Sequence, residues 1–261
     1  MTSPRGTLYL VPNTLDFGLH GEPAPLDDLL PMGVIRTAAR LEHWVGENAK
    51  TTRAFLKRVD AVCPLAQPLQ AISIVELPRA AKGRASPGGS EGSALEATAS
   101  LLAPALAGHD LGLISEAGLA ALADPGAQLV AAAHAAELRV HTLPGASAIS
   151  LAVSAGGLNG QSFAFVGYLP VEVQARSMRI RELEELSRRH AQTQLMIETP
   201  YRNRALLGAL VAQLRPQTSL AVCIGLATHA ESTISRTVAS WRSAPIEMPA
   251  DVPAVFAFLG R

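Results

Sequence analysis

The chain has 261 residues, of which 48% are hydrophobic and 17% are charged. This length predicts one large or two smaller domains, and the hydrophobic share is ample for a buried core. Lys and Arg total 22 and Asp and Glu also total 22, so the formal net charge is zero. A neutral net charge makes a protein that binds the phosphates of nucleic acid less expected. No apolar run is long enough, and free enough of charge, Gly and Pro, to predict a membrane span.

Cysteine and histidine usage gives no sign of a disulfide framework or a metal centre. Cys63 and Cys223 lie far apart in the sequence, and the seven His residues show no metal-ligand spacing. The opening residues 1–6 lack the basic and then apolar layout of a signal peptide. We therefore expect a cytoplasmic protein without a metal ion.

Short apolar runs alternate with helical patterns through the first half of the chain. Strands are predicted at residues 6–11, 43–46, 71–77, 111–115 and 139–143, and helices at 26–39, 49–59, 94–106 and 127–136. The helix at 26–39 is predicted despite Pro31 inside it. This rhythm predicts a mostly parallel sheet with helices on both faces. Residues 79–93, rich in Gly, Ser, Lys and Arg, are predicted to be a mobile loop, either a substrate lid or a tolerated insertion.

The alternation continues after Ser147, with strands predicted at 163–166, 194–197 and 219–223. Segments 232–238 and 254–259 read as further strands with no helix between them, which predicts a mixed sheet. A boundary near Pro144 divides the chain into domains 1–144 and 145–261, so the predicted class is α/β with two domains. The basic residues between 176 and 190 alternate with glutamates and predict a solvated helix face rather than a nucleic-acid patch.

Three loops at predicted strand ends are candidate ligand sites, because open α/β sheets bind ligands at the carboxyl ends of their strands. Pro12 ends the first strand. Segment SEAG at 115–118 offers small residues that admit a ligand to the backbone, and Glu116 suits a cationic or hydroxylated group. In segment LPGASA at 143–148, Gly145 permits a sharp bend and Ser147 can cap the next helix. A plain turn, a surface carboxylate and a simple cap are the structural alternatives.

The sequence lacks the motifs of several other classes of ligand-binding proteins and enzymes. No G-x-G-x-x-G follows a strand, and no Walker A sequence is present. Segment GASAI at 145–149 lacks the closing glycine of a nucleophile elbow, and no His–acid pair accompanies it. Segment DPG at 124–126 is interpreted as structural, with Pro125 opening the next helix.

Five segments together carry a family resemblance: GTLYLVP at 6–12, SEAG at 115–118 with DPG at 124–126, LPGASA at 143–148, FVGYLP at 165–170 and ETPYR at 198–202. In this order and spacing they resemble the class III, tetrapyrrole-methylase-type S-adenosylmethionine methyltransferases. Within that superfamily they are most similar to the branch that methylates a ribose 2′-hydroxyl of small-subunit ribosomal RNA. The likeness covers nearly the whole chain.

This resemblance implies a two-domain fold with S-adenosylmethionine, the methyl donor, bound folded in a cleft between the domains. By the same likeness, the donor contacts fall on Pro12, Glu116, Ala117, Gly118, Leu119, Ser147, Ala148, Met196 and Ile224, many of them through the backbone. The family is commonly homodimeric, so the likeness implies a homodimer. The likeness does not name the acceptor, which is an RNA or a small molecule.

The chain departs from this branch where charged groups would face the acceptor. The branch sequence T-P-I-G-N-L is NTLDFG at 13–18, E-D-T-R is ENAK at 47–50, and A-R-E-L-T-K is IGLATH at 224–229. Replacing an Arg by Gly removes a bidentate grip on phosphate or carboxylate. We therefore expect that donor binding is kept, whereas the likeness gives poor support for ribosomal RNA as the acceptor.

A general base is optional for methyl transfer, because alignment of the reacting atoms supplies most of the catalysis. The candidates are Glu47, Lys50 and Glu198. Glu47 and Lys50 are three residues apart and could share a helix face, where a structural ion pair is favoured over catalysis. Three functions remain open: a methyltransferase with an unidentified acceptor, a donor-binding protein that has lost catalysis, and a ribosomal RNA 2′-O-ribose methyltransferase.

Overall fold

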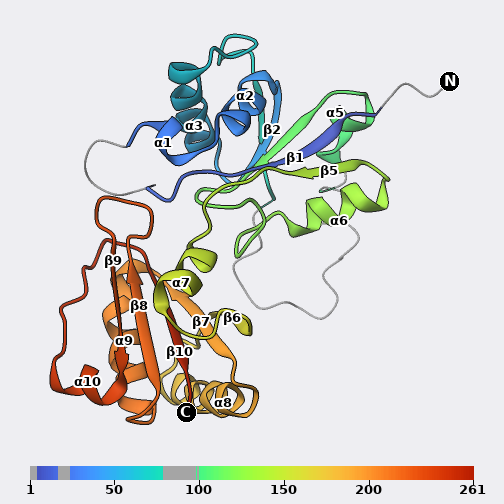
Figure 1. Ribbon diagram of the computed structural model, residues 1–261. Coiled ribbons are helices and arrows are strands. Elements are labelled where there is room, and N and C mark those ends of the chain that lie inside the picture. The colour runs from blue at the N-terminus through green and yellow to red at the C-terminus, as the bar shows by residue number, and fades with distance from the viewer. Residues whose placement is uncertain (1–4, 17–23, 79–97, 99) are drawn as a thin grey trace. The chain divides into compact units, whose positions relative to one another are not determined.

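The protein is described here from a computed structural model that covers residues 5–16, 24–78, 98 and 100–261. The chain forms two compact units, one reaching to Ala146 and the other running from Ser147 to Arg261 (Figure 1). The predicted division after residue 144 is close to this point. The predicted loop at 79–93 lies outside the described residues. In the described part of the chain, every helix is too short or too polar to cross a lipid bilayer.

The first unit is built on a parallel sheet of five strands in the order β3-β2-β4-β1-β5. The strands are β1 (Thr7–Val11), β2 (His43–Gly46), β3 (Ser73–Glu76), β4 (Leu111–Ile114) and β5 (Arg139–Thr142). Each pair of neighbours is parallel, which confirms the predicted sheet. Because all strands point the same way, their carboxyl ends meet along one edge of this sheet.

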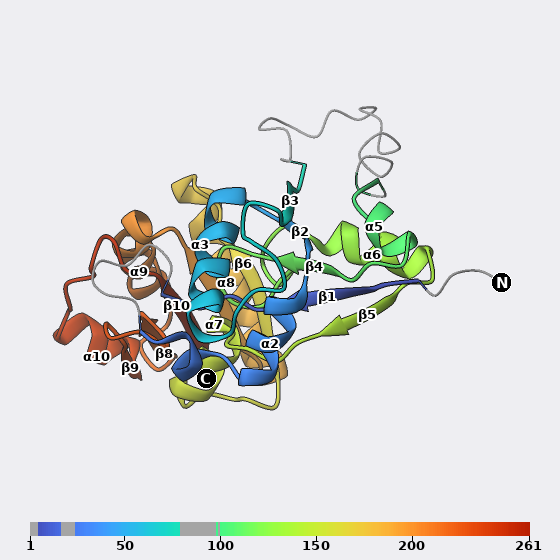
Figure 2. The ribbon, with the colours of Figure 1, turned by 90° about the horizontal axis from the view of Figure 1, so that it is seen from above.

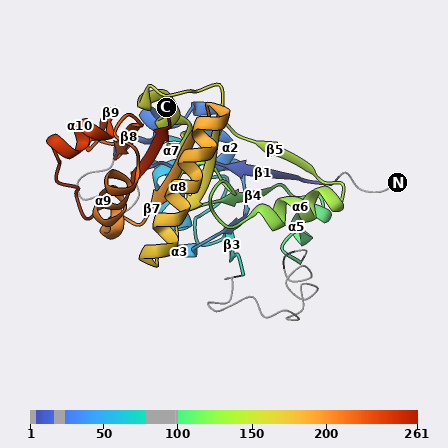
Figure 3. The ribbon, with the colours of Figure 1, turned by 90° about the horizontal axis from the view of Figure 1, so that it is seen from below.

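Helices cover both faces of this sheet, as predicted (Figures 2 and 3). Helices α1 (Leu26–Leu29), α2 (Met32–Arg40) and α3 (Ala49–Val62) pack on the face that carries Val11 and Trp44. Helices α5 (Ala103–Leu106) and α6 (Ala127–Ala135) pack on the face that carries Leu8 and Val45. Neighbouring strand residues reach opposite faces because side chains alternate along a strand.

The single helix predicted at 26–39 is wrong, because the chain breaks into α1 and α2 at Pro31. Leu30 is extended, with φ −126° and ψ 139°, and Pro31 takes the N-cap position of α2. A residue before proline is pushed out of the helical region, and proline lacks the N–H that a continuous helix would need. The helix predicted at 94–106 is described chiefly at its end, as α5.

The second unit is built on a mixed sheet in the order β6-β7-β10-β8-β9. Its strands are β6 (Phe163–Tyr168), β7 (Thr193–Glu198), β8 (Ser219–Ile224), β9 (Ser232–Thr237) and β10 (Ala254–Leu259). Strands β6 and β7 are parallel, whereas β10 runs antiparallel to both β7 and β8, and β9 is antiparallel to β8. The predicted mixed sheet is therefore confirmed.

The helices of this unit are α7 (Ala148–Gly156), α8 (Val173–His190), η1 (Pro200–Arg202), α9 (Asn203–Gln213) and α10 (Val238–Ser243). Helix α10 contradicts the expectation that no helix separates the last two strands. The Thr237 side chain caps α10 by accepting the Ser240 N–H, and this local bond starts a helix of only six residues. Along α8, ion pairs such as Arg179–Glu182 and Arg188–Glu185 fit the predicted solvated face.

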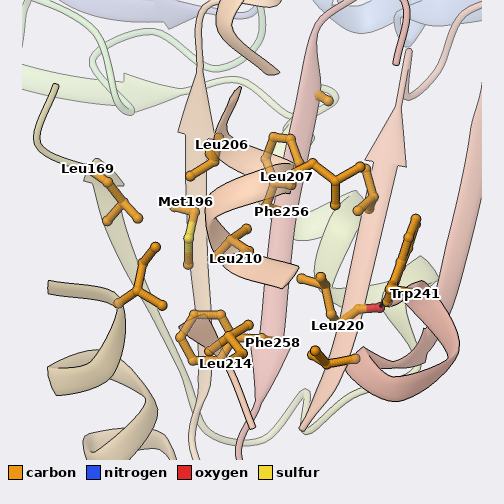
Figure 4. Packing of buried hydrophobic residues seen from close by; sticks show 14 of the residues in the cluster. Leu169, Met196, Leu206, Leu207, Leu210, Leu214, Leu220, Trp241, Phe256 and Phe258 are labelled. Atoms are coloured by element: carbon orange, nitrogen blue, oxygen red, sulfur yellow. Dashed lines mark hydrogen bonds between the residues drawn. The ribbon is translucent and has the colours of Figure 1, made fainter. Parts of the chain in front are cut away.

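The core of the second unit lies on one face of its sheet, under α8, α9 and α10. Figure 4 shows Met196 of β7, Phe256 and Phe258 of β10 and Leu220 of β8 packed around Leu210 of α9. Trp241 of α10 is buried beside them, and its indole N–H donates to the Leu220 carbonyl over 2.9 Å. Helix α7 contributes Ala152 to a smaller cluster on the opposite side of the strands.

Candidate functional site

Two predicted ligand loops leave neighbouring strands of the first unit and are bonded to each other. Strands β1 and β4 are parallel partners, with Val11 opposite Ile114, so the loops that begin at Pro12 and Ser115 start side by side. The Asn13 N–H donates to the Gly118 carbonyl over 2.8 Å. The loops at Pro12 and at 115–118 are therefore held to each other by a backbone hydrogen bond.

Asn13, which sequence reasoning did not single out, joins these loops through its side chain as well. Its Nδ2 donates to the carbonyls of Ser115 (3.2 Å) and Glu116 (2.9 Å), and its Oδ1 accepts the Thr14 N–H (2.9 Å). Asn13 is 6% exposed. The only signal in the sequence is an asparagine directly after the proline that ends a strand, where Asn side chains bond nearby backbone.

The loop from Ser115 to Gly126 is rich in small residues, and several of them have unusual backbone conformations. Gly118 has φ +68°, and Ala121 and Ala123 have φ 63° and 66°, in the left-handed region that alanine rarely adopts. The Ser115 Oγ accepts the Ala121 N–H over 3.3 Å and helps to hold this path. Strain of this kind persists where the surrounding structure enforces it, and such places are often functional.

Pro125 does not open the next helix, contrary to the prediction. Gly126, with φ +127°, occupies the N-cap of α6, and the helix begins at Ala127. A positive φ of this size is open to glycine and strained for other residues, so the turn depends on Gly126 rather than on the proline.

Glu47 reaches the same edge of the sheet from the end of β2. Its Oε1 accepts the Glu116 N–H over 3.1 Å. The expectation that Glu47 and Lys50 share a helix face is wrong, because Asn48 is the N-cap of α3 and Glu47 therefore precedes the helix. Burial raises the pKa of Glu47, and its bonds to the Glu116 N–H and to Ser115 partly oppose that rise.

Asp124 adds a third carboxyl group to this edge of the sheet. Burial, reinforced by repulsion from Glu47 and Glu116, raises the pKa of Asp124 from 3.8 to about 7. The strand ends of the first unit therefore gather three acidic side chains, and a cationic group bound beside them would relieve the repulsion between their carboxylates. Over the ranges that the structure describes, no group of three or more His, Cys, Asp and Glu side chains is arranged to hold a metal ion.

The third predicted loop brings Gly145 against Pro12 at the same edge of the sheet. Ser147 follows as the N-cap residue of α7, but among the described residues its hydroxyl caps none of the helix amides. Its carbonyl instead accepts the Leu151 N–H over 3.0 Å. The predicted side-chain cap is therefore wrong, and the buried Ser147 is held by its backbone.

The remaining predicted residues lie in the second unit. The side chains of Met196 and Ile224 are 0% and 7% exposed in the core, so the backbone is what each can offer a ligand. Glu198 at the end of β7 is 8% exposed, pairs with Arg202 over 3.1 Å and accepts the Thr199 N–H over 2.8 Å. These bonds favour a structural role for Glu198, and its catalytic role stays a prediction.

No family model matches the chain. Relatives named ribosomal RNA small subunit methyltransferase I are similar in sequence. The Mesorhizobium japonicum protein is 36% identical over 132 residues, which cover 51% of this chain and 44% of the relative. The Synechocystis protein is 34% identical over 134 residues, covering 51% and 47%. The Streptococcus pyogenes protein is 28% identical over 209 residues, covering 79% and 60%. The matches thus span less than two thirds of these relatives.

Solved structures share the fold over nearly the full chain. Uroporphyrin-III C-methyl transferase from Thermus thermophilus, complexed with S-adenyl homocysteine, matches with a TM-score of 0.53 and 18% identity, covering 97% of each chain. A conserved hypothetical protein from Aeropyrum pernix K1 matches with a TM-score of 0.59 and 16% identity, covering 98% of this chain and 85% of the other. This chain therefore shares the fold of these two solved structures.

Two features of these loops bear on the predicted donor contacts. Ala117 is half-buried and Gly118 is buried in the loop after β4, and neither carries a bulky side chain. Asn13 and Asp16 are two of the positions at which the sequence was expected to depart from the branch that it resembles. Their polar side chains are now engaged in bonds within the first unit.

Proposed function

We propose that this protein binds S-adenosylmethionine and transfers its methyl group to an acceptor. The observation that carries the proposal is the bonded pair of loops after β1 and β4, in which Asn13 is tied to Glu116 and Gly118. Such a backbone-lined edge suits a ligand that is recognised through peptide groups. The carboxylates of Glu47 and Glu116 suit the positive sulfonium. The names of the sequence relatives and the S-adenyl homocysteine complex of a structural neighbour support the same donor.

The donor supplies an electrophilic methyl group on its sulfonium, and the protein chiefly has to align it with the acceptor. Alignment of this kind is worth roughly 7–11 kcal/mol in well-oriented reactions. In the first unit we assign the donor contacts to Pro12, Glu116, Ala117, Gly118 and Leu119. The contacts predicted on Ser147, Ala148, Met196 and Ile224 belong to the same proposal. Glu47 is favoured as a positioning group, since its carboxylate already holds the Glu116 N–H.

Calorimetry with S-adenosylmethionine and S-adenosylhomocysteine tests donor binding. We expect the intact protein to bind at micromolar concentrations, and an absence of binding below millimolar would overturn the proposal. Gly118→Ala should weaken binding, because Gly118 has φ +68° and a β-carbon there would lie 3.3 Å from Leu15 Cδ2. Gly157→Ala is the matched control: Gly157 ends α7 with φ +64°, so the backbone strain is similar outside the loop.

Ribosomal RNA is a candidate for the acceptor, and the names of the sequence relatives favour it. Mapping ribose methylation of small-subunit ribosomal RNA with and without the gene tests this candidate. Loss of one 2′-O-methyl mark, restored by the wild-type gene, would support it, and an unchanged pattern would leave a different RNA or a small molecule as acceptor.

A donor-binding protein without catalysis is the alternative from another class, motivated by the charged groups lost around ENAK and IGLATH. Incubation with a donor that carries a radioactive methyl group and with size-fractionated cell extract separates the two. Incorporation into any fraction contradicts the non-catalytic alternative. Binding without incorporation into protein, RNA or small molecules contradicts the methyltransferase.

We further propose that the protein is a cytoplasmic homodimer. Val171, Val173 and Met178, near one another in the sequence around the start of α8, are 69%, 64% and 64% exposed, and exposed apolar side chains favour an interface. Cys63 and Cys223 are unpaired, which suits a reducing compartment. Light scattering during gel filtration should give a molar mass twice that of the chain. The Val173→Glu variant should give the molar mass of the monomer. A monomeric wild-type protein would contradict the dimer.

A further inference from the structure

Strands β1 and β4 are joined by a polar side chain at both of their ends. At the amino ends, the Thr7 N–H donates to Asp110 Oδ1 over 2.9 Å. At the carboxyl ends, Asn13 Nδ2 donates to the Ser115 and Glu116 carbonyls. The two links connect the same strands, but only the second reaches the loops that carry the proposed donor contacts.

The second link holds the main chain of Glu116 from both sides. Asn13 binds the Glu116 carbonyl, and Glu47 Oε1 accepts the Glu116 N–H. Next along the loop, the Gly118 carbonyl accepts the Asn13 N–H. Both polar backbone groups of Glu116 are thus bonded within the protein, so the direction of this peptide is set before any ligand arrives. A site held in this way loses less conformational entropy on binding.

The segment that carries Asn13 is itself anchored at its far end. Arg58 of α3 donates from Nη1 and Nη2 to the two carboxylate oxygens of Asp16 over 3.1 and 3.0 Å. The same guanidinium donates to Thr14 Oγ1 over 3.0 Å. These side chains are largely buried, with exposed fractions of 24% for Arg58 and 11% for Asp16. Asn13 therefore lies between strand β1 and the residues that Arg58 binds, so its segment is fixed at both ends.

We propose that Asn13 is a positioning residue of the donor site, which sets the spacing and direction of the Glu116–Gly118 backbone through its side-chain amide. This inference rests on the proposed function for its link to the donor. In this role Asn13 acts through the loop that it binds, so its effect is on donor affinity and on the order of the loop.

Asn13→Ala removes the carboxyl-end link, and Asp110→Ala, the matched control, removes the amino-end link between the same strands. Hydrogen exchange of the donor-free proteins should show faster exchange at residues 115–119 in Asn13→Ala and unchanged exchange there in Asp110→Ala. Calorimetry with S-adenosylmethionine should show binding weakened about tenfold in Asn13→Ala, equal to the loss of about 1.4 kcal/mol, and wild-type affinity in Asp110→Ala. Asn13→Thr, which keeps one hydroxyl donor, should fall between Asn13→Ala and the wild type and serves if the alanine variant does not fold.

The outcomes separate this inference from the proposed function. Wild-type exchange at 115–119 in Asn13→Ala overturns the positioning role, whether or not the protein binds the donor. If Asn13→Ala and Asp110→Ala weaken donor binding equally, the positioning role is also overturned, because that result would indicate a general loss of stability. A wild-type protein that binds no donor overturns the proposed function, while the exchange data still decide whether Asn13 orders the loop.

Discussion

Gly145 lies so close to Pro12 that no side chain fits between them. A β-carbon at 145 would stand 2.3 Å from the Pro12 Cβ and 2.6 Å from its Cγ. The sequence predicts a glycine here for a sharp bend, whereas the structure requires it for the approach of two loops that leave neighbouring strands. The proline ring is rigid, so a larger residue at 145 must displace backbone.

We expect Gly145→Ala to lower the free energy of unfolding by about 1–3 kcal/mol, the usual penalty for overpacking a tight contact. Donor affinity should fall with it, since Pro12 is moved. Denaturant unfolding and calorimetry measure the two effects.

Gly33→Ala in α2 is the control, because a β-carbon there would meet nothing within 4 Å among the described residues. That variant should gain about 0.5–1 kcal/mol from better helix propensity, and a loss at 33 equal to that at 145 would contradict the contact argument.

Ala121 and Ala123 should each tolerate glycine, because alanine is strained at φ 63° and 66°. A left-handed conformation costs an L-residue about 1–2 kcal/mol, and glycine's extra freedom in the unfolded chain costs about 0.4–1 kcal/mol. We therefore expect Ala123→Gly to raise the melting temperature slightly. Ala131→Gly, an exposed position inside α6, should lower stability by about 1 kcal/mol. Equal losses at 123 and 131 would show that residue 123 is not strained.

The raised pKa of Asp124 makes stability depend on pH in a defined direction. Between the ordinary value of 3.8 and about 7, the folded protein binds a proton at Asp124 that the unfolded chain does not. The free energy of unfolding should therefore fall as pH rises through this window. Asp124→Asn removes the charge and should flatten the dependence, so the variant gains on the wild type from pH 4 to pH 8. Parallel melting curves for both proteins across that range would contradict the raised pKa.

The ion pair between Asp16 and Arg58 should couple more strongly than the one between Asp110 and Arg40. The first pair is largely buried, at 11% and 24% exposure, and the second is more exposed, at 30% and 48%. Double-mutant cycles to alanine should give a coupling of about 1–3 kcal/mol for the first and below about 1 kcal/mol for the second. A smaller coupling for Asp16–Arg58 would show that Arg58 does not anchor the segment after β1.

Much of the architecture follows from the sequence, because its signals are local. Apolar runs ended by Pro12 or followed by Ser115 place the strands of a parallel sheet, and strand–helix alternation gives the fold class. The errors are also local in origin. Pro31 divides a helix that periodicity alone continues, and the Thr237 cap starts a helix too short to show a period.

The residues of the sequence determined which loops carry the candidate site, since small residues and strand-ending prolines mark them directly. Only the tertiary structure decided how those loops are held. The partners of the Asn13 amide lie 102 and 103 residues away, and the carboxyl group of Glu47 that shifts Asp124 comes from a different strand end. A hydrogen bond or a charge interaction depends on distance in space. Parallel strands bring together residues that the sequence keeps far apart, so such contacts appear only once the sheet has formed.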